Sequence, residues 1–93
     1  MKTYGYIRVS TKEQNLDRQI DALEELPIDQ IFEDKQSGKD FDRPAYLDMM
    51  EVINPGDLII VKSIDRLGRN YDEILEQWRI ITKEKQADIL VLE

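Results

Sequence analysis

The chain has 93 residues and a mass of 11.0 kDa, which fits one domain because domains typically run to about 100–150 residues. Its formal net charge of −7 argues against a protein that coats nucleic acid by bulk electrostatics, although a local basic site remains compatible with it. The chain has no cysteine and no histidine, which excludes disulfides, thiolate chemistry, Ser-His or Cys-His catalysis and the usual zinc sites.

The first half of the chain predicts two strands with a helix between them. Residues 2–9 are rich in Tyr, Ile and Val, which is typical of a buried strand. Apolar residues then recur at helical spacing, with Asn15 as the cap and Pro27 as the end of the helix; they are Leu16, Ile20, Leu23 and Leu26. Residues 28–32 predict a second strand, and the polar stretch 34–42 predicts a loop.

The second half continues the alternation. Asp42 as a cap and Pro44 in the first turn predict a second helix, with an apolar stripe of Leu47, Met50 and Ile53 and with Tyr46 and Met49 beside it. A strand is predicted at residues 57–62, a third helix from about 71 to 85, and a last strand at 87–92.

The order of these elements, β-α-β-α-β-α-β, defines the expected fold class. The predicted strands show little alternation of apolar and polar residues, which indicates strands buried on both faces. We therefore expect an α/β, three-layer fold with a mainly parallel four-stranded sheet flanked by helices. Because the chain stops on a predicted core strand, we expect residues 1–93 to be one domain that lacks the C-terminal part of a longer protein.

Polar side chains gather where the predicted strands end, which is where parallel α/β sheets form their sites. Residues 8–11 bring an arginine and two hydroxyls, residues 37–43 bring Ser37 and Arg43, and residues 62–69 bring an aspartate and two arginines. Arginines around a serine hydroxyl suit an anionic phosphorus centre, because guanidiniums fork onto phosphate oxygens and stabilise added charge. Taken singly, each feature has a plainer interpretation: the hydroxyls at 10 and 11 could cap a helix, and the arginines could be solvated.

Three ordered blocks give these residues a family resemblance. Residues 6–14 read YIRVSTKEQ, residues 34–38 read DKQSG and precede Arg43-Pro44, and residues 56–69 contain GDLIIV and DRLGR. These blocks resemble the signatures of the catalytic domain of serine recombinases, the resolvase/invertase family, and the resemblance extends over essentially the whole chain. It does not distinguish a resolvase, an invertase, a transposase or an integrase.

The resemblance implies a reaction and a set of site residues. Ser10 would attack a DNA phosphodiester, form a 5′-phosphoseryl link and release a 3′-hydroxyl, with no cofactor and no metal. The arginines implied to bind and activate the phosphate are Arg8, Arg43, Arg66 and Arg69. Asp65 matches an acidic residue that acts as general acid/base or orients an arginine. Gln14, Gln19 and Ser37 match polar residues that contact the substrate.

The resemblance also implies partners. The expected partner is DNA, bound by a full-length protein that forms a homodimer and then a tetramer to exchange strands. The dimerisation helix and DNA-binding domain of the family are not found in residues 1–93. No apolar run reaches the ~20 residues of a membrane span and no signal peptide is visible, so we expect a cytoplasmic protein without a membrane partner.

Other functions remain open from the residues alone. The same fold could serve as a regulatory or assembly domain that does no chemistry. It could also be an unrelated phosphate or nucleotide binder, although the chain has neither a GxGxxG motif nor a P-loop. A metal phosphatase would be separated from metal-free catalysis by measuring activity in a chelator.

Overall fold

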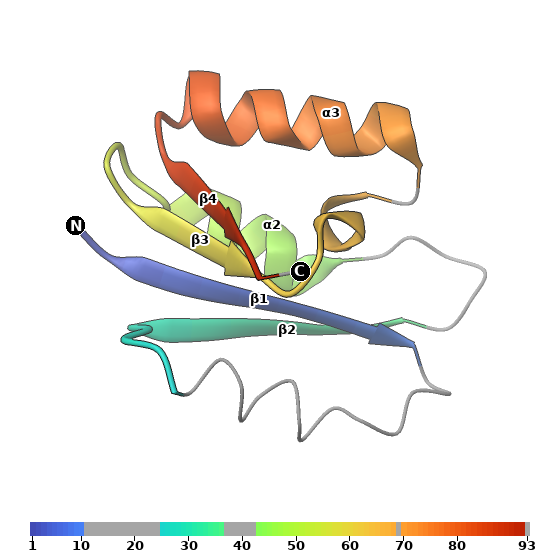
Figure 1. Ribbon diagram of the computed structural model, residues 1–93, viewed down its shortest axis with the longest axis horizontal. Coiled ribbons are helices and arrows are strands. Elements are labelled where there is room, and N and C mark those ends of the chain that lie inside the picture. Colours follow the sequence, from blue (N-terminus) through green and yellow to red (C-terminus); the bar gives the residue numbers. More distant parts are fainter. Residues whose placement is uncertain (11–24, 37–42, 69, 93) are drawn as a thin grey trace.

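Four strands form one sheet in the order β2-β1-β3-β4, and every neighbouring pair is parallel (Figure 1). The strands are β1 (Thr3–Ser10), β2 (Gln30–Gln36), β3 (Leu58–Val61) and β4 (Asp88–Val91). The structure is a computed structural model that describes residues 1–10, 25–36, 43–68 and 70–92. The predicted α/β class with a parallel four-stranded sheet is confirmed.

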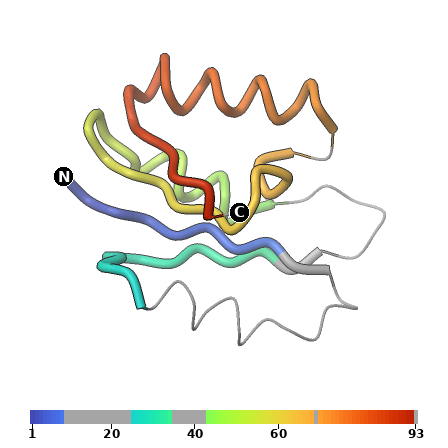
Figure 2. The backbone as a smooth tube through the Cα atoms, viewed as in Figure 1, coloured from blue at the N-terminus to red at the C-terminus, as the bar shows by residue number. Residues whose placement is uncertain are grey.

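The helical elements connect these strands, as the path of the chain in Figure 2 shows. They are α2 (Pro44–Val52), the 3-10 turn η1 (Ile64–Leu67), α3 (Tyr71–Arg79) and the π-helical turn η2 (Ile80–Glu84). Together α3 and η2 span nearly the whole of the third predicted helix. The predicted helix between the first two strands falls mainly on residues 11–24, outside the described residues. No helix in the described part of the chain is long and apolar enough to cross a membrane.

The sheet separates two apolar clusters because successive side chains of a strand point to opposite faces. On one face, α2, η1 and η2 pack against the strands in the larger cluster, which contains Tyr4, Tyr6, Phe32, Tyr46, Met49, Ile53, Ile59, Val61, Leu67, Ile81 and Ala87. On the other face, Ile7 and Ile60 form a smaller cluster. The predicted two-sided burial of the central strands is therefore observed.

The strand β2 differs from its prediction. It was expected to end at residue 32, yet it runs through Asp34 to Gln36 in register with the carboxyl-terminal half of β1. Arg8 pairs with Asp34, and Ser10 pairs with Gln36. Polar residues have low intrinsic strand propensity, but ladder pairing with a neighbouring strand overrides that preference.

The second helix is rotated relative to its predicted apolar stripe. Leu47 was expected to face the core but is 56% exposed, whereas Tyr46 and Met49 are 1% and 0% exposed. The expected cap Asp42 lies outside the described residues, and Arg43 occupies the cap position without a side-chain cap hydrogen bond. A buried carboxylate on β2, Asp34, instead accepts hydrogen bonds from the first turn and fixes this rotation.

The turn before β3 is fastened by the buried carboxylate of Asp57. Its oxygens accept hydrogen bonds from the backbone N–H groups of Lys2 and Asn54, both at 2.9 Å. These two hydrogen bonds lower the pKa of Asp57 below its ordinary value. The carboxylate thus holds the start of β1 beside the start of β3.

The strand order creates a natural position for a site. β1 lies between β2 and β3, so the connections that follow β1 and β2 lead to opposite sides of β1. In open α/β sheets, ligands bind beyond the carboxyl ends of the strands at such a reversal. A site is therefore expected at the carboxyl ends of β1 and β3, together with η1.

Candidate active site

The first component is Arg8, on the carboxyl-terminal half of β1. Its side chain is half-buried, and Nη2 donates a hydrogen bond to the Asp65 carbonyl oxygen at 2.7 Å. Burial lowers the pKa of the Arg8 guanidinium; Tyr6 and Asp65 oppose this shift, while the charges of Arg66 and Arg43 add to it. Arginine nevertheless stays protonated in proteins, so positive charges are concentrated here.

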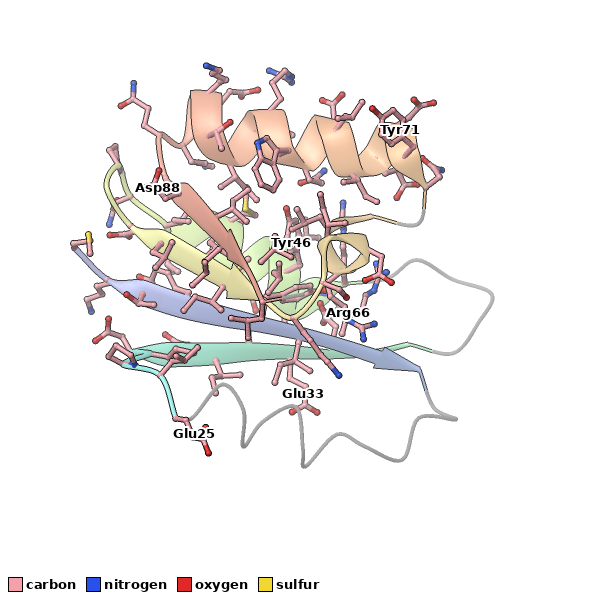
Figure 3. The ribbon with its side chains drawn as sticks, viewed as in Figure 1. Glu25, Glu33, Tyr46, Arg66, Tyr71 and Asp88 are labelled. Carbon is pink, nitrogen blue, oxygen red and sulfur yellow. The ribbon has the colours of Figure 1, made fainter. Side chains whose placement is uncertain are left out.

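The second component is η1, which follows β3 and carries Asp65 and Arg66. Ser63 Oγ donates a hydrogen bond to Asp65 Oδ1 just before the turn. Leu67 is fully buried and anchors the turn in the core, while Arg66 is half-buried. Figure 3 shows Arg66 at the end of the sheet opposite the N-terminus. The turn thus presents a carboxylate and a guanidinium beside Arg8.

The third component is Arg43, which stands at the start of α2. Its Nη1 donates a hydrogen bond to the Leu67 carbonyl oxygen at 2.9 Å. Its guanidinium carbon lies 4.4 Å from the centroid of the Tyr46 ring. Arg43 and Arg8 therefore each bind a carbonyl of η1, one from the helix side and one from the strand side.

The carboxylate of Asp34 supports this arrangement, and sequence reasoning assigned it no role. It is 3% exposed, and its oxygens accept hydrogen bonds from Tyr6 Oη at 2.8 Å, Ala45 N at 2.8 Å and Tyr46 N at 3.0 Å. The pKa of Tyr6 is raised above its ordinary value, mainly by burial and in second place by the hydrogen bond to Asp34. The signal that the sequence does offer is the position of Asp34 at the start of the DKQSG block. The strand that contains it and the missing side-chain cap hydrogen bond at Arg43 appear only in the structure.

The predicted residues Arg8, Arg43, Asp65 and Arg66 lie close together in the structure: Arg8 and Arg43 donate hydrogen bonds to the carbonyls of Asp65 and Leu67 in η1, and the charges of Arg43, Asp65 and Arg66 act on Arg8. Ser10 is the last residue of β1, two positions beyond Arg8, and its backbone pairs with Gln36. The remaining predicted site residues lie outside the described residues; they are Gln14, Gln19, Ser37 and Arg69. Their places in the site remain predictions.

The arrangement suits the binding of a phosphate diester. Three guanidiniums supplied by separate segments can donate hydrogen bonds to phosphate oxygens and offset the charge that accumulates on them during substitution. The Asp65 carboxylate can orient a guanidinium or exchange a proton. Among the described residues, no group of three or more acidic side chains could hold a metal ion.

Comparison with known proteins gives a consistent result. The family described as "Resolvase, N terminal domain" matches residues 3–93. The chain is 45% identical over 75 residues to the DNA-invertase hin of Salmonella typhimurium, and the matched residues are 81% of this chain and 40% of that protein. It is 40% identical over 73 residues to the Tn917 resolvase of Enterococcus faecalis, and the matched residues are 78% of this chain and 40% of that protein. The chain therefore spans about two fifths of the length of these relatives.

Solved structures support the same fold. The first ORF of transposon ISC1904 from Sulfolobus solfataricus P2 matches with a TM-score of 0.76 and 32% identity, covering 100% of this chain and 68% of that one. The C-terminal catalytic domain of ISC1926 TnpA, an IS607-like serine recombinase, matches with a TM-score of 0.72, again over 100% of this chain and 68% of that one. At 21% identity, this second match bears on the fold alone.

Proposed function

Because the chain belongs to the family of resolvase N-terminal domains, we propose that it is the catalytic domain of a site-specific serine recombinase. The observation that carries the proposal is the convergence of Arg8, Arg43 and Arg66 beyond the carboxyl ends of β1 and β3. Ser10 ends the same strand that carries Arg8. A serine at the end of a strand that also carries one of these arginines fits nucleophilic attack on a phosphodiester without histidine.

In the proposed reaction, Ser10 Oγ attacks the phosphorus of a DNA phosphodiester as the serine proton passes to a base. The bond from phosphorus to the 3′ oxygen breaks, and that oxygen takes up a proton and leaves as a 3′-hydroxyl. The products are a 5′-phosphoseryl link and a free 3′ end, and the phosphate ester bond energy is retained. Attack by a different 3′-hydroxyl reverses the steps and joins the exchanged strands.

Each charged residue has a proposed part in that reaction. Arg8, Arg43 and Arg66 bind the scissile phosphate and stabilise the negative charge that grows on its oxygens. Asp65 acts as the proton-exchanging group or orients an arginine, and its hydrogen bond from Ser63 Oγ fixes its carboxylate. Arg69 joins the arginines in this proposal, while Gln14, Gln19 and Ser37 are proposed to contact the DNA around the phosphate.

The proposed partner is duplex DNA, engaged by the protein at its natural length as a homodimer and then a tetramer. The net charge of −7 indicates that these residues contribute catalysis more than general duplex affinity, because each phosphate contact requires a positive charge. Among the described residues, Arg8, Arg43 and Arg66 instead lie around a single position at η1. This division predicts that losing an arginine affects cleavage more than binding.

The test is trapping of a covalent protein–DNA adduct on a nicked suicide duplex that contains the recombination site, in a buffer with EDTA. Ser10→Ala should form no adduct, while Ser63→Ala, which retains the proposed nucleophile and loses only the hydrogen bond to Asp65, should still form it, although more slowly. Arg8→Ala and Arg66→Ala should each slow adduct formation by about 10²-fold, as expected for losing one charged donor to the transition state. An undiminished adduct with Ser10→Ala would place the nucleophile elsewhere.

A further inference from the structure

Two contacts of the Arg43 guanidinium bear on its orientation. One edge donates a hydrogen bond from Nη1 to the Leu67 carbonyl oxygen at 2.9 Å. Its guanidinium carbon lies over the ring of Tyr46, 4.4 Å from the ring centroid. A hydrogen bond at one edge leaves the plane free to turn about that bond, whereas contact with a ring opposes this rotation. Together they fix both the position and the plane of the guanidinium.

Tyr46 is in turn held rigidly from several directions. It is 1% exposed, and its hydroxyl donates a hydrogen bond to Gln77 Oε1 on α3 at 2.8 Å. Its ring meets the ring of Tyr6 edge-on, with centroids 5.1 Å apart and an interplanar angle of 66°. Its backbone N–H donates to the buried carboxylate of Asp34. Figure 3 shows Tyr46 in the layer between the sheet and α3.

We propose that Tyr46 is a positioning residue that sets the plane of the Arg43 guanidinium toward the scissile phosphate. The inference rests on the proposed function, in which Arg43 stabilises charge on that phosphate. A guanidinium donates its hydrogen bonds within its own plane, so its orientation decides whether they reach phosphate oxygens. A ring whose face carries negative charge attracts the cation and keeps that plane fixed before substrate arrives.

This role makes a kinetic prediction that differs from that of an ordinary core residue. An arginine that is already oriented stabilises the transition state without reorganisation at the moment of reaction. Loss of the ring should therefore slow adduct formation more than it weakens DNA binding. Tyr46→Leu should lower the rate constant for adduct formation by about 5- to 30-fold, the range expected for a partly desolvated cation–π contact.

The test varies the charge on the ring face while keeping the shape of the side chain. Tyr46 is replaced by phenylalanine, 4-fluorophenylalanine and 3,4,5-trifluorophenylalanine, because each added fluorine withdraws negative charge from the ring face. Adduct formation on the nicked suicide duplex is then timed under single-turnover conditions, and DNA affinity is measured separately. The rate constant should be largely retained with phenylalanine and should fall stepwise along the fluorinated series, with affinity unchanged.

Two further variants separate the possible failures. Tyr4→Leu removes a similarly buried tyrosine that contacts Phe32 rather than an arginine, and it should leave the rate constant unchanged. Arg43→Ala tests the underlying function. If Arg43→Ala slows the reaction but the fluorinated series is flat, the positioning role of Tyr46 is wrong and the proposed function stands. If Arg43→Ala leaves the rate unchanged, the assignment of Arg43 to the phosphate is wrong.

Discussion

Removing the Asp34 carboxylate should change the effect of Tyr6→Phe on stability from destabilising to neutral or stabilising. Asp34 accepts hydrogen bonds from the fully buried Tyr6 hydroxyl at 2.8 Å and from the first-turn N–H groups of Ala45 and Tyr46. In the wild type, Tyr6→Phe deletes a hydrogen bond to a charged acceptor and should cost about 1.5–3 kcal/mol. In an Asp34→Ala background the same hydroxyl is buried without its acceptor, so Tyr6→Phe should be neutral or stabilising.

The loss in the free energy of unfolding expected for Asp34→Ala follows from the same contacts. Loss of a helix cap costs about 0.5–2 kcal/mol. A buried hydroxyl left without a partner adds about 1–3 kcal/mol. The two costs together, about 1.5–5 kcal/mol, are a large part of the total stability of a typical domain, which is about 5–15 kcal/mol. Asp34→Asn keeps one acceptor oxygen and should fall between the wild type and Asp34→Ala.

Urea unfolding of the wild type, both single variants and the double variant, at neutral pH, measures these free energies. The reasoning requires a coupling energy between residues 6 and 34 well above the ~0.5 kcal/mol scatter of independent sites. If Tyr6→Phe costs the same free energy in both backgrounds, the hydroxyl and the carboxylate do not support one another and the account of α2 is refuted.

Three other predictions concern the turns and the buried tyrosine. Gly68→Ala should lower stability by about 1–3 kcal/mol and slow cleavage, because a new Cβ would lie 2.6 Å from the Cβ of Glu73. Gly56→Ala is the control, because the φ of Gly56 is +89° and no atom lies within 4 Å of the Cβ that alanine would add. Backbone strain should lower its stability in urea unfolding while leaving cleavage unchanged. Equal cleavage by the two variants would contradict a steric role for residue 68. Asp57→Asn should destabilise the protein at neutral pH. The difference in the free energy of unfolding should shrink in acid, because a carboxyl with a lowered folded pKa contributes its full stability above the unfolded pKa and loses it as pH falls through the folded pKa. A difference that does not change with pH would exclude this linkage. Burial raises the pKa of Tyr46 from 10.0 to about 12, with Arg43 opposing, so the folded state binds one more proton and loses stability between those pH values. Tyr46→Phe should remove that loss from alkaline unfolding curves, and curves that remain parallel would contradict it.

The sheet was predictable because its strands carry a strong signal. Strands such as residues 58–61 are continuously apolar, and only burial on both faces explains that pattern. The carboxyl-terminal half of β2 was not predictable from local sequence. Asp34 and its neighbours lack strand propensity, and they extend because β1 offers a complete set of ladder partners.

The grouping of the arginines followed from the rule that parallel strands end at a common edge. That rule predicted the approach of Arg8, Arg43 and Arg66, and in the structure Arg8 and Arg43 each donate a hydrogen bond to a carbonyl of η1, the turn that carries Arg66. It did not reveal the supporting residues. Asp34 caps a helix that begins ten positions later, and Tyr46 faces Arg43 only because that cap sets the rotation of α2. Both depend on contacts between separate elements, which local spacing does not encode.

Identification of the residue joined to DNA tests the central proposal most directly. The protein at its natural length would be trapped on the suicide duplex, digested with nuclease and protease, and analysed by mass spectrometry. The account predicts a nucleotide remnant, linked through its 5′ phosphate, on the peptide that contains Ser10 and on that side chain. A remnant on Thr11, Ser63 or any other residue, or efficient strand cleavage with no protein-linked nucleotide, would contradict it.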